Sequence, residues 1–522
     1  MAISRRDFVK KSAISTLSLA IINQAVLAKS DLGELPRGIA EAEGFDSEAI
    51  LNFLDAIKTS GLEWHSFMLV KNGKVISEAW WKPFASANKH TLYSLSKSFT
   101  STAIGILIDE GKLTVNEPVI KFFPDELPQE ISENLKNMTV KHLLTMNTGH
   151  NTDTMPEFRR FENQTWIKSF LNHPVIHKPG SHYLYNTGAT YMLGAILHKI
   201  TGQTLEQFLQ PRLFAPLNII GYDWEKSPQG LNTAGYGLRV STEDIAKFGQ
   251  LYLQKGKWNG KQIISENWVE EASKAQTTSQ AGNNDWAQGY GYQFWRCKPG
   301  FYRGDGAYGQ FCMIMPEYNT VLVMTCESFN LQKTMDIAYE NLLPGIRHKA
   351  LPTNNLAQNK LKNEIAKLNI LVPKGSKASS LAQKYSDKIF KINSNQFGIT
   401  EIGFGLFENA GFLRINKGNG FEKIGFGWEK WLVNANKTTN PFTEQPKAKT
   451  PTSAVTFRIA STATWLNDST LQINFKFVDQ VHGDKLICVF IENNVEISLL
   501  NSVAENNKNT VDKREKINGT MI

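Results

Sequence analysis

Residues 93–100 read Tyr93-Ser94-Leu95-Ser96-Lys97-Ser98-Phe99-Thr100, and an apolar segment follows them. Apolar residues recur at helical spacing from Phe99 to Ile108, which predicts a buried helix with Ser94 in its first turn. Residues three apart on a helix share a face, with roughly 5–6 Å between their β-carbons. The Lys97 amine can therefore reach the Ser94 hydroxyl.

A hydroxyl beside an amine at the start of a helix is a candidate nucleophile. The first turn supplies free backbone N–H groups and the positive end of the helix dipole, which favour negative charge developing beside Ser94. If burial lowers the pKa of Lys97, its neutral amine can take the serine proton. The alternative is that Ser94 is an N-cap and Lys97 a solvated cation. A second Ser-x-x-Lys pattern, Ser86 to Lys89, is followed by no helical period and is not a candidate.

The composition is that of an ordinary globular protein. The chain has 522 residues, of which 41% are hydrophobic and 20% charged, and this length allows two or three domains. The net charge is +8, but no basic run contains interleaved aromatics, so no nucleic-acid partner is predicted. The four cysteines show no C-x-x-C spacing, and neither H-E-x-x-H nor a P-loop occurs. The sequence therefore predicts no metal and no cofactor.

The N-terminus has the features of a bacterial export signal. Ser4-Arg5-Arg6-Asp7-Phe8-Val9-Lys10 is a twin-arginine pattern, an apolar run from Ala13 to Ile22 follows, and Val26-Leu27-Ala28 then offers a cleavage site near Ala28. This predicts a signal peptide over residues 1–28, too short for a comfortable membrane span. A retained anchor is the alternative. The mature protein is predicted to be periplasmic or secreted, with no stable membrane span after the leader is removed.

The order of elements predicts the domains. Residues 29–349 contain a hairpin around Asn72-Gly73, many helices, three strands and a closing helix, which predicts an α/β sandwich of an antiparallel sheet flanked by helices plus a helical region. Residues 350–380 are predicted to be a linker with a weak helix. Residues 381–500 carry short Gly- and aromatic-rich strands, which predict a small all-β domain. Residues 501–522 are predicted to be a frayed polar tail.

Two later motifs join the Ser94-Leu-Ser-Lys97 pattern. They are Pro179-Gly-Ser-His-Tyr-Leu-Tyr185-Asn186 and Gly304-Asp305-Gly306-Ala307, and the second is predicted to open a strand. In this order the motifs resemble the serine-reactive hydrolases of the class C β-lactamase and penicillin-binding type, most of all the branch of 6-aminohexanoate-dimer hydrolases and related esterases. The resemblance covers roughly residues 45–345 and implies a β-lactamase/transpeptidase-like fold.

The resemblance also implies a set of reacting groups. Ser94 would be the nucleophile that forms an acyl-enzyme, Lys97 its proton partner, and Tyr185 a group that works with the lysine as general base and then acid. A cation beside a phenol is expected to lower the pKa of Tyr185 and let a proton move between the two. The backbone N–H groups of Ser94 and Ala307 would form the oxyanion hole.

Two motifs depart from the family pattern. The second motif is often Tyr-x-Asn, whereas Asn186 follows Tyr185 directly, so a role for Asn186 as a ligand of the substrate amide is less secure. The third motif usually has a cation, then Thr or Ser, then Gly. Here it is Gly304-Asp305-Gly306, which lacks the cation that would hold a β-lactam carboxylate. Asp305, with Gly306 in the same predicted substrate-binding strand, either favours a substrate amine or is a solvated turn residue.

The sequence therefore predicts an exported serine hydrolase that cleaves an amide or ester bond in a small molecule or short peptide. Two alternatives stay open. One is a D-amino-acid peptidase or carboxypeptidase that acts on cell-wall peptides, and the other is a non-catalytic ligand-binding or sensor protein with the same fold. Neither the substrate nor the oligomeric state follows from the sequence.

Overall fold

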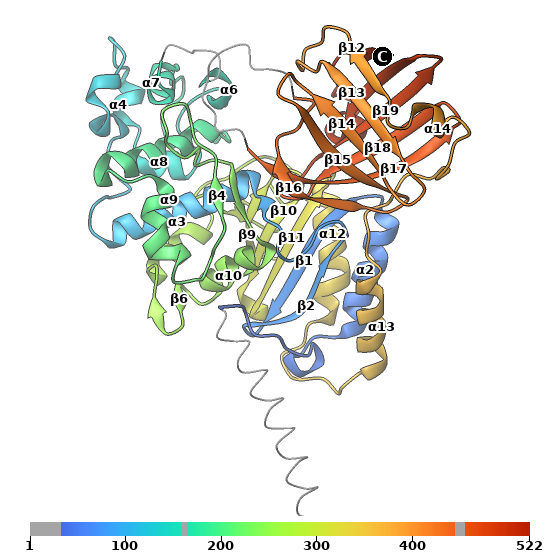
Figure 1. Cartoon of the computed structure of the whole chain (residues 1–522). Helices are drawn as coiled ribbons and strands as arrows, with labels where there is room; N and C mark the ends of the chain where they lie inside the picture. The colour runs from blue at the N-terminus through green and yellow to red at the C-terminus, as the bar shows by residue number, and fades with distance from the viewer. Residues whose placement is uncertain (1–32, 159–163, 444–454) are drawn as a thin grey trace, which may run out of the picture.

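A six-stranded antiparallel sheet organises the first part of the chain and takes its strands from both ends of that part (Figure 1). Asn72 and Gly73 have φ angles of 53° and 78°, as a two-residue hairpin turn requires, so the predicted hairpin is confirmed. In order across the sheet, the strands are β2 (Lys74–Trp80), β1 (Glu63–Lys71), β11 (Thr320–Glu327), β10 (Gln310–Met315), β9 (Tyr302–Gly306) and β8 (Trp295–Arg296).

Helices cover both faces of this sheet. Successive side chains of a strand point to opposite faces, and along β1 Phe67 and Leu69 enter one core while Met68 and Val70 enter the other. The first core is closed by α2 (Ser47–Ser60) and α12 (Leu331–Leu342), and the second by α10 (Thr242–Leu253) and α3 (Ser96–Asp109). This is the α/β sandwich that the sequence predicts.

A helical region adjoins α3, on the left in Figure 1. Its longest helix, α8 (Thr187–Thr201), packs on α3. No helix of the described residues is both long and apolar enough to cross a membrane. The shorter elements are α4 (Glu133–Asn137), α5 (Val140–Leu144), α6 (Met155–Phe158), α7 (Trp166–Asn172), α9 (Leu205–Leu209), α11 (Glu266–Ser273), β3 (His90–Thr91), β4 (Asp223–Trp224), β5 (Leu238–Val240), β6 (Lys257–Trp258) and β7 (Lys261–Gln262).

The second part of the chain is a barrel, which confirms the predicted all-β domain. Its sheet closes on itself because β15 pairs with β17. Aromatic side chains such as Phe404, Trp465 and Phe490 fill the interior. In sheet order, the strands are β15 (Phe421–Trp428), β14 (Gly411–Asn416), β13 (Glu401–Leu406), β12 (Ile389–Ile392), β21 (Ile517–Met521), β20 (Asn494–Asn501), β19 (Gly483–Ile491), β18 (Thr470–Phe477), β17 (Phe457–Asn467) and β16 (Leu432–Thr438), accompanied by α14 (Ala382–Tyr385) and α15 (Ser502–Asn506).

The computed structural model describes residues 33–158, 164–443 and 455–522, so the predicted leader over residues 1–28 lies outside the described residues. Two other segments differ from their predictions. Within the predicted linker 350–380, α13 (Asn355–Ala366) packs on α2 and joins its core. Within the predicted tail 501–522, β21 pairs with both β12 and β20. Each segment contributes only a few apolar residues to a core that other segments build. Its sequence therefore gives little sign of the helix or strand that it forms.

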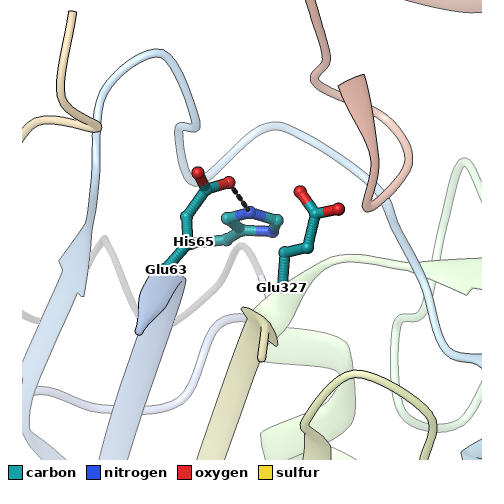
Figure 2. A group of neighbouring side chains, drawn as sticks. All are labelled: Glu63, His65 and Glu327. Carbon is teal, nitrogen blue, oxygen red and sulfur yellow. Dashed lines mark hydrogen bonds and ion pairs between the residues drawn. The ribbon is translucent and has the colours of Figure 1, made fainter. Parts of the chain in front are cut away.

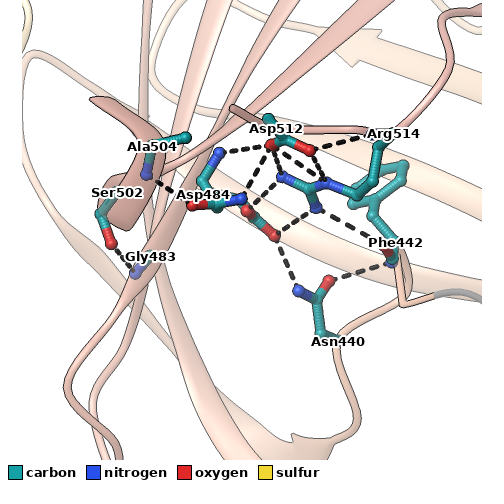
Figure 3. Close-up of polar contacts among 9 residues, drawn as sticks. Asn440, Phe442, Gly483, Asp484, Ser502, Ala504, Asp512 and Arg514 are labelled. Carbon is teal, nitrogen blue, oxygen red and sulfur yellow. Dashed lines mark hydrogen bonds and ion pairs between the residues drawn. The ribbon is translucent and has the colours of Figure 1, made fainter. Parts of the chain in front are cut away.

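Arg514 holds the segment before β21 to the barrel (Figure 3). Its guanidinium lies 2.8 Å from Asp484 Oδ1 and 2.6 Å from Asp512 Oδ2. Asn440 Nδ2 also donates to Asp484 Oδ2 over 2.7 Å. The side chains of the two aspartates are only 2% and 5% exposed, so they depend on the guanidinium for their charge compensation.

Replacing Arg514 by methionine leaves two buried carboxylates facing each other. Arg514→Met is therefore expected to destabilise the barrel by about 3 kcal/mol, measured by thermal unfolding of the full chain. Lys516→Met is the matched control, because the Lys516 side chain is 60% exposed in its pair with Glu496, and it should stay within about 0.5 kcal/mol of the parent. Equal unfolding of Arg514→Met and the parent would show that the network contributes nothing.

Candidate active site

Ser94 lies in a 3₁₀ turn, Tyr93–Leu95, which runs directly into α3. Tyr93 has a φ of 48°, in the left-handed region that an aromatic residue rarely adopts. The turn keeps Ser94 and Lys97 on one side of the helix start, and Lys97 Nζ donates to Ser94 Oγ over 3.1 Å. The predicted buried helix is present, and the two side chains that the sequence paired are in contact.

Lys97 is buried, with only 1% of its surface exposed. Besides Ser94, its amine donates to the Gly235 carbonyl over 2.8 Å and to the Thr187 hydroxyl over 3.4 Å. Burial lowers the pKa of Lys97 to about 7, and the negative charge of Asp153 opposes part of that decrease. Near neutral pH a large fraction of the amine is therefore unprotonated and able to accept a proton.

Tyr185 lies beside this pair. Lys97 Nζ is 4.9 Å from the centre of the Tyr185 ring, which stacks on Trp295 at 5.7 Å and meets Tyr290 edge-on. The structure thus brings together the three side chains that the resemblance implies. The predicted direction of the pKa shift is wrong, however. Burial raises the pKa of Tyr185, and its hydrogen bond with Ser94 lowers it only in part, so the phenol stays protonated.

The strand β9 packs against the turn that carries Ser94. A Cβ added to Gly306 would lie 2.1 Å from the Leu92 carbonyl oxygen, so only glycine permits this approach. The predicted motif does not open a strand: Gly306 ends β9, and Ala307 begins the turn that follows. Gln310 Nε2 donates to the Ala307 carbonyl over 3.1 Å and so holds the peptide that follows Ala307. The end of β9 at Gly306 is therefore held against the segment that leads into the Ser94 turn, and Ala307 follows it in the chain.

Asn186 does not face a substrate. It is fully buried and is the N-cap of α8, where its Oδ1 accepts from the Gly188 N–H over 3.0 Å. The same oxygen accepts from the Thr154 hydroxyl over 2.9 Å, and Nδ2 lies 3.3 Å from His150 Nδ1. The predicted substrate contact of Asn186 is corrected to a capping role, because its polar atoms are already bonded within the fold.

Asp305 is neither a solvated turn residue nor a free anion. It is 8% exposed, and Arg303 Nη2 and Nε bond to its Oδ2 at 2.9 and 3.0 Å. Residues two apart on a strand share a face, which places this pair side by side. The Arg303 guanidinium lies over the Trp286 and Trp295 rings at 4.9 and 5.8 Å. The strand thus has a cation, Arg303, but Asp305 already compensates its charge. The predicted binding of a substrate amine by Asp305 is corrected, because its carboxylate is already paired with Arg303.

Three residues at the site escaped the sequence analysis. The Gly235 carbonyl and the Thr187 hydroxyl receive the Lys97 amine, and Asp153 accepts the Thr187 N–H over 2.9 Å. Thr187 directly follows the Tyr185-Asn186 motif and begins α8. Its position next to that motif could have indicated Thr187 as a site residue. Gly235 and Asp153 lie in loops with no motif, and only the packing of α8 on α3 brings them to Lys97.

Residues 59–343 match the family model for β-lactamases. The chain is 24% identical over 279 residues to the 6-aminohexanoate-dimer hydrolase of Paenarthrobacter ureafaciens, a match that covers 49% of this chain and 71% of that protein. It is 24% identical over 240 residues to a β-lactamase of Escherichia coli K12, which covers 42% and 61% of the two chains. A solved structure, the octameric penicillin-binding protein homologue from Pyrococcus abyssi, is similar with a TM-score of 0.46 and 15% identity, and the match covers 90% of this chain and 99% of that one.

The lowered pKa of Lys97 predicts the pH dependence of Ser94 reactivity. Lowering the pH protonates the amine, so the rate constant for labelling by a fluorophosphonate should fall about tenfold per pH unit below about 7 and level off above it. Lys97→Arg should remove this pH dependence together with the labelling, because a guanidinium stays protonated. A labelling rate that is constant between pH 5 and 9 would exclude Lys97 as the proton acceptor.

The capping role of Asn186 predicts a stability effect. Asn186→Ala removes the N-cap and leaves the Thr154 hydroxyl without its acceptor, so thermal unfolding should show a loss of about 1–3 kcal/mol. Asn172→Ala, at an exposed site at the end of α7, is the control and should unfold like the parent. A substrate ligand would behave differently: the variant would unfold like the parent and raise only KM.

Proposed function

Because the chain belongs to the β-lactamase family, we propose that it is a serine hydrolase that cleaves an amide or ester bond through an acyl-enzyme on Ser94. One observation carries this proposal. The Ser94 hydroxyl receives a hydrogen bond of 3.1 Å from a buried amine whose pKa is lowered to about 7. A serine becomes a nucleophile when a neighbouring base can take its proton at working pH, and Lys97 meets that requirement.

Acylation would use Lys97 as the base. As Ser94 Oγ attacks the carbonyl carbon, its proton passes to the neutral Lys97 amine and a tetrahedral intermediate forms. The Ser94 and Ala307 backbone N–H groups would donate hydrogen bonds to the former carbonyl oxygen and stabilise its negative charge. Tyr185, protonated because burial raises its pKa, would then donate its proton to the leaving nitrogen or oxygen and recover one from the Lys97 ammonium. The bond to the leaving group breaks, and the acyl-enzyme remains.

Deacylation would run through the same groups in reverse. A water molecule gives a proton to Lys97, by way of Tyr185, as its oxygen attacks the acyl carbon. Collapse of the second intermediate breaks the bond to Ser94 Oγ, which takes its proton back from the Lys97 ammonium. The acid product leaves, and all three side chains return to their starting protonation states, so no further acid or base is required.

The substrate class follows from the charges at the site. Arg303 is paired with Asp305, so β9 offers no uncompensated cation to a substrate carboxylate. This favours an amide or ester with no carboxylate next to the scissile bond over a β-lactam, which carries a carboxylate there. The relative from Paenarthrobacter ureafaciens is a 6-aminohexanoate-dimer hydrolase. Such a dimer is a linear amide whose charged ends are separated from the scissile bond by several methylene groups, so it is the first substrate to test. The twin-arginine pattern supports the further proposal that the hydrolase is exported.

The nucleophile is tested by covalent labelling of the purified chain. A fluorophosphonate probe should label the protein once, on Ser94, and Ser94→Ala should lose all labelling and lower hydrolysis by about 10³-fold or more. Ser86→Ala is the matched control, because Ser86 begins the other Ser-x-x-Lys pattern, is exposed, and should leave labelling unchanged. A parent chain that binds ligands but is never labelled would be a binding protein.

Substrates are compared on the same preparation. Short-chain esters, the 6-aminohexanoate dimer and D-Ala-D-Ala peptides would be assayed side by side, with Ser94→Ala as the blank. Highest kcat/KM on a linear amide or ester supports the proposal. Highest kcat/KM on the D-Ala-D-Ala peptide would instead identify a peptidase of the cell-wall type.

A further inference from the structure

The barrel inserts one loop into the hydrolase domain. This segment, residues 476–482, comprises the end of β18 and the loop that joins it to β19, and its Val478 side chain is buried in the core that α2 and α12 share. Gln480 Oε1 accepts the Thr91 hydroxyl over 2.6 Å, and Thr91 lies three residues before Ser94 in the chain. The loop thus reaches the segment that leads into the catalytic turn.

An ion cluster anchors this loop. Glu63, His65 and Glu327 lie together at the ends of β1 and β11, in an arrangement that resembles a metal site (Figure 2). Lys476 supplies the positive charge there, with its Nζ 2.6 Å from Glu63 Oε1 and 2.9 Å from Glu327 Oε2. Both carboxylates raise the pKa of Lys476, which stays charged despite its burial. The cluster is therefore an ion network between the two domains and not a vacant metal centre.

His482 extends this network to the catalytic turn. Its Nδ1 lies 2.7 Å from Glu327 Oε1, and its Nε2 lies 2.7 Å from the Tyr93 hydroxyl. Because a carboxylate only accepts, Nδ1 donates to Glu327, and Nε2 is hydrogen-bonded to the Tyr93 hydroxyl. The imidazole also meets the Tyr308 ring edge-on, with ring centres 4.5 Å apart. One side chain of the barrel thus contacts two tyrosines of the hydrolase domain.

These tyrosines are chain neighbours of the two residues whose N–H groups would form the proposed oxyanion hole. Tyr93 directly precedes Ser94, and Tyr308 directly follows Ala307. Both have left-handed backbones, with φ angles of 48° and 63°, and such a conformation persists in a non-glycine residue only where its surroundings impose it. The rings lie 5.3 Å apart and share His482 as a neighbour, so the contact with His482 supports both unusual turns at once.

We propose that His482 is a positioning residue for the hydrolase reaction: by holding Tyr93 and Tyr308, it sets the relative position of the Ser94 and Ala307 N–H groups. The inference rests on the proposed role of Ser94 as the nucleophile. It makes the barrel a required part of the active site and not only an appended domain. Because the oxyanion contacts are made in the transition state, loss of His482 lowers kcat more than it changes KM.

The test uses His482→Ala and Tyr93→Phe in the full chain. Each should lower kcat for ester hydrolysis by about tenfold to hundredfold while KM changes by less than about threefold, and fluorophosphonate labelling should slow in parallel. The kcat of the double variant should fall no further than that of the more impaired single variant, because both substitutions remove the same hydrogen bond. A double variant in which the two losses multiply would overturn the proposal.

Gln480→Ala is the matched control, because it removes a different contact of the same loop. Its kcat should stay within about twofold of that of the parent. If the substitutions only loosened the loop, Gln480→Ala and His482→Ala would lower kcat equally, and that result would overturn the proposal. If His482→Ala does not fold, Tyr93→Phe decides, and a parental kcat in that variant overturns the proposal. A parent chain that is never labelled refutes the role of Ser94, and the positioning role with it. Labelling of the parent and His482→Ala at equal rates refutes the positioning role alone.

Discussion

The burial of the Lys97 amine beside Ser94 is the constraint on which the rest of the site depends. Its hydrogen-bond partners are two hydroxyls and one carbonyl, all neutral. A protonated amine there lacks a compensating charge in contact, so burial lowers its pKa into the range where it can act as a base. Thr100 helps to fix this environment, because its hydroxyl donates to the Ala234 carbonyl one residue before Gly235. By excluding water from the amine, the fold thus gives Lys97 the lowered pKa that the proposed role as a base requires.

The charge that β9 brings to the site is compensated within the protein. Arg303 and Asp305 neutralise each other on β9. Tyr185 stays protonated through burial. β9 therefore offers no uncompensated charge at the site, as the proposal of an amide or ester without a neighbouring carboxylate requires. A site that attracts a carboxylate needs a cation without a partner. Here Asp305 forms an ion pair with the Arg303 guanidinium, so that cation is not available.

The barrel and the hydrolase domain are joined by charged groups that neither domain could bury alone. Glu327 has 1% of its side chain exposed and lies between Lys476 and His482, both of which belong to the barrel. Without the barrel, the carboxylates of Glu63 and Glu327 would lose Lys476, their shared compensating charge. The contact is also continuous with the catalytic turn through His482. The hydrogen-bonded network of the domain interface thus ends at Tyr93, the residue before Ser94.

The sequence alone determined the local features: the hairpin at Asn72-Gly73, the buried helix after Ser94 and the contact of Lys97 with Ser94. Each depends on residues a few positions apart, where backbone geometry dictates proximity. Tyr185 was found through a motif. Tertiary structure decided the rest, because burial and charge compensation depend on distant neighbours. It buried Asn186 as a cap, paired Asp305 with Arg303, and kept the Tyr185 phenol protonated. It also brought His482 to Tyr93 from 389 residues away.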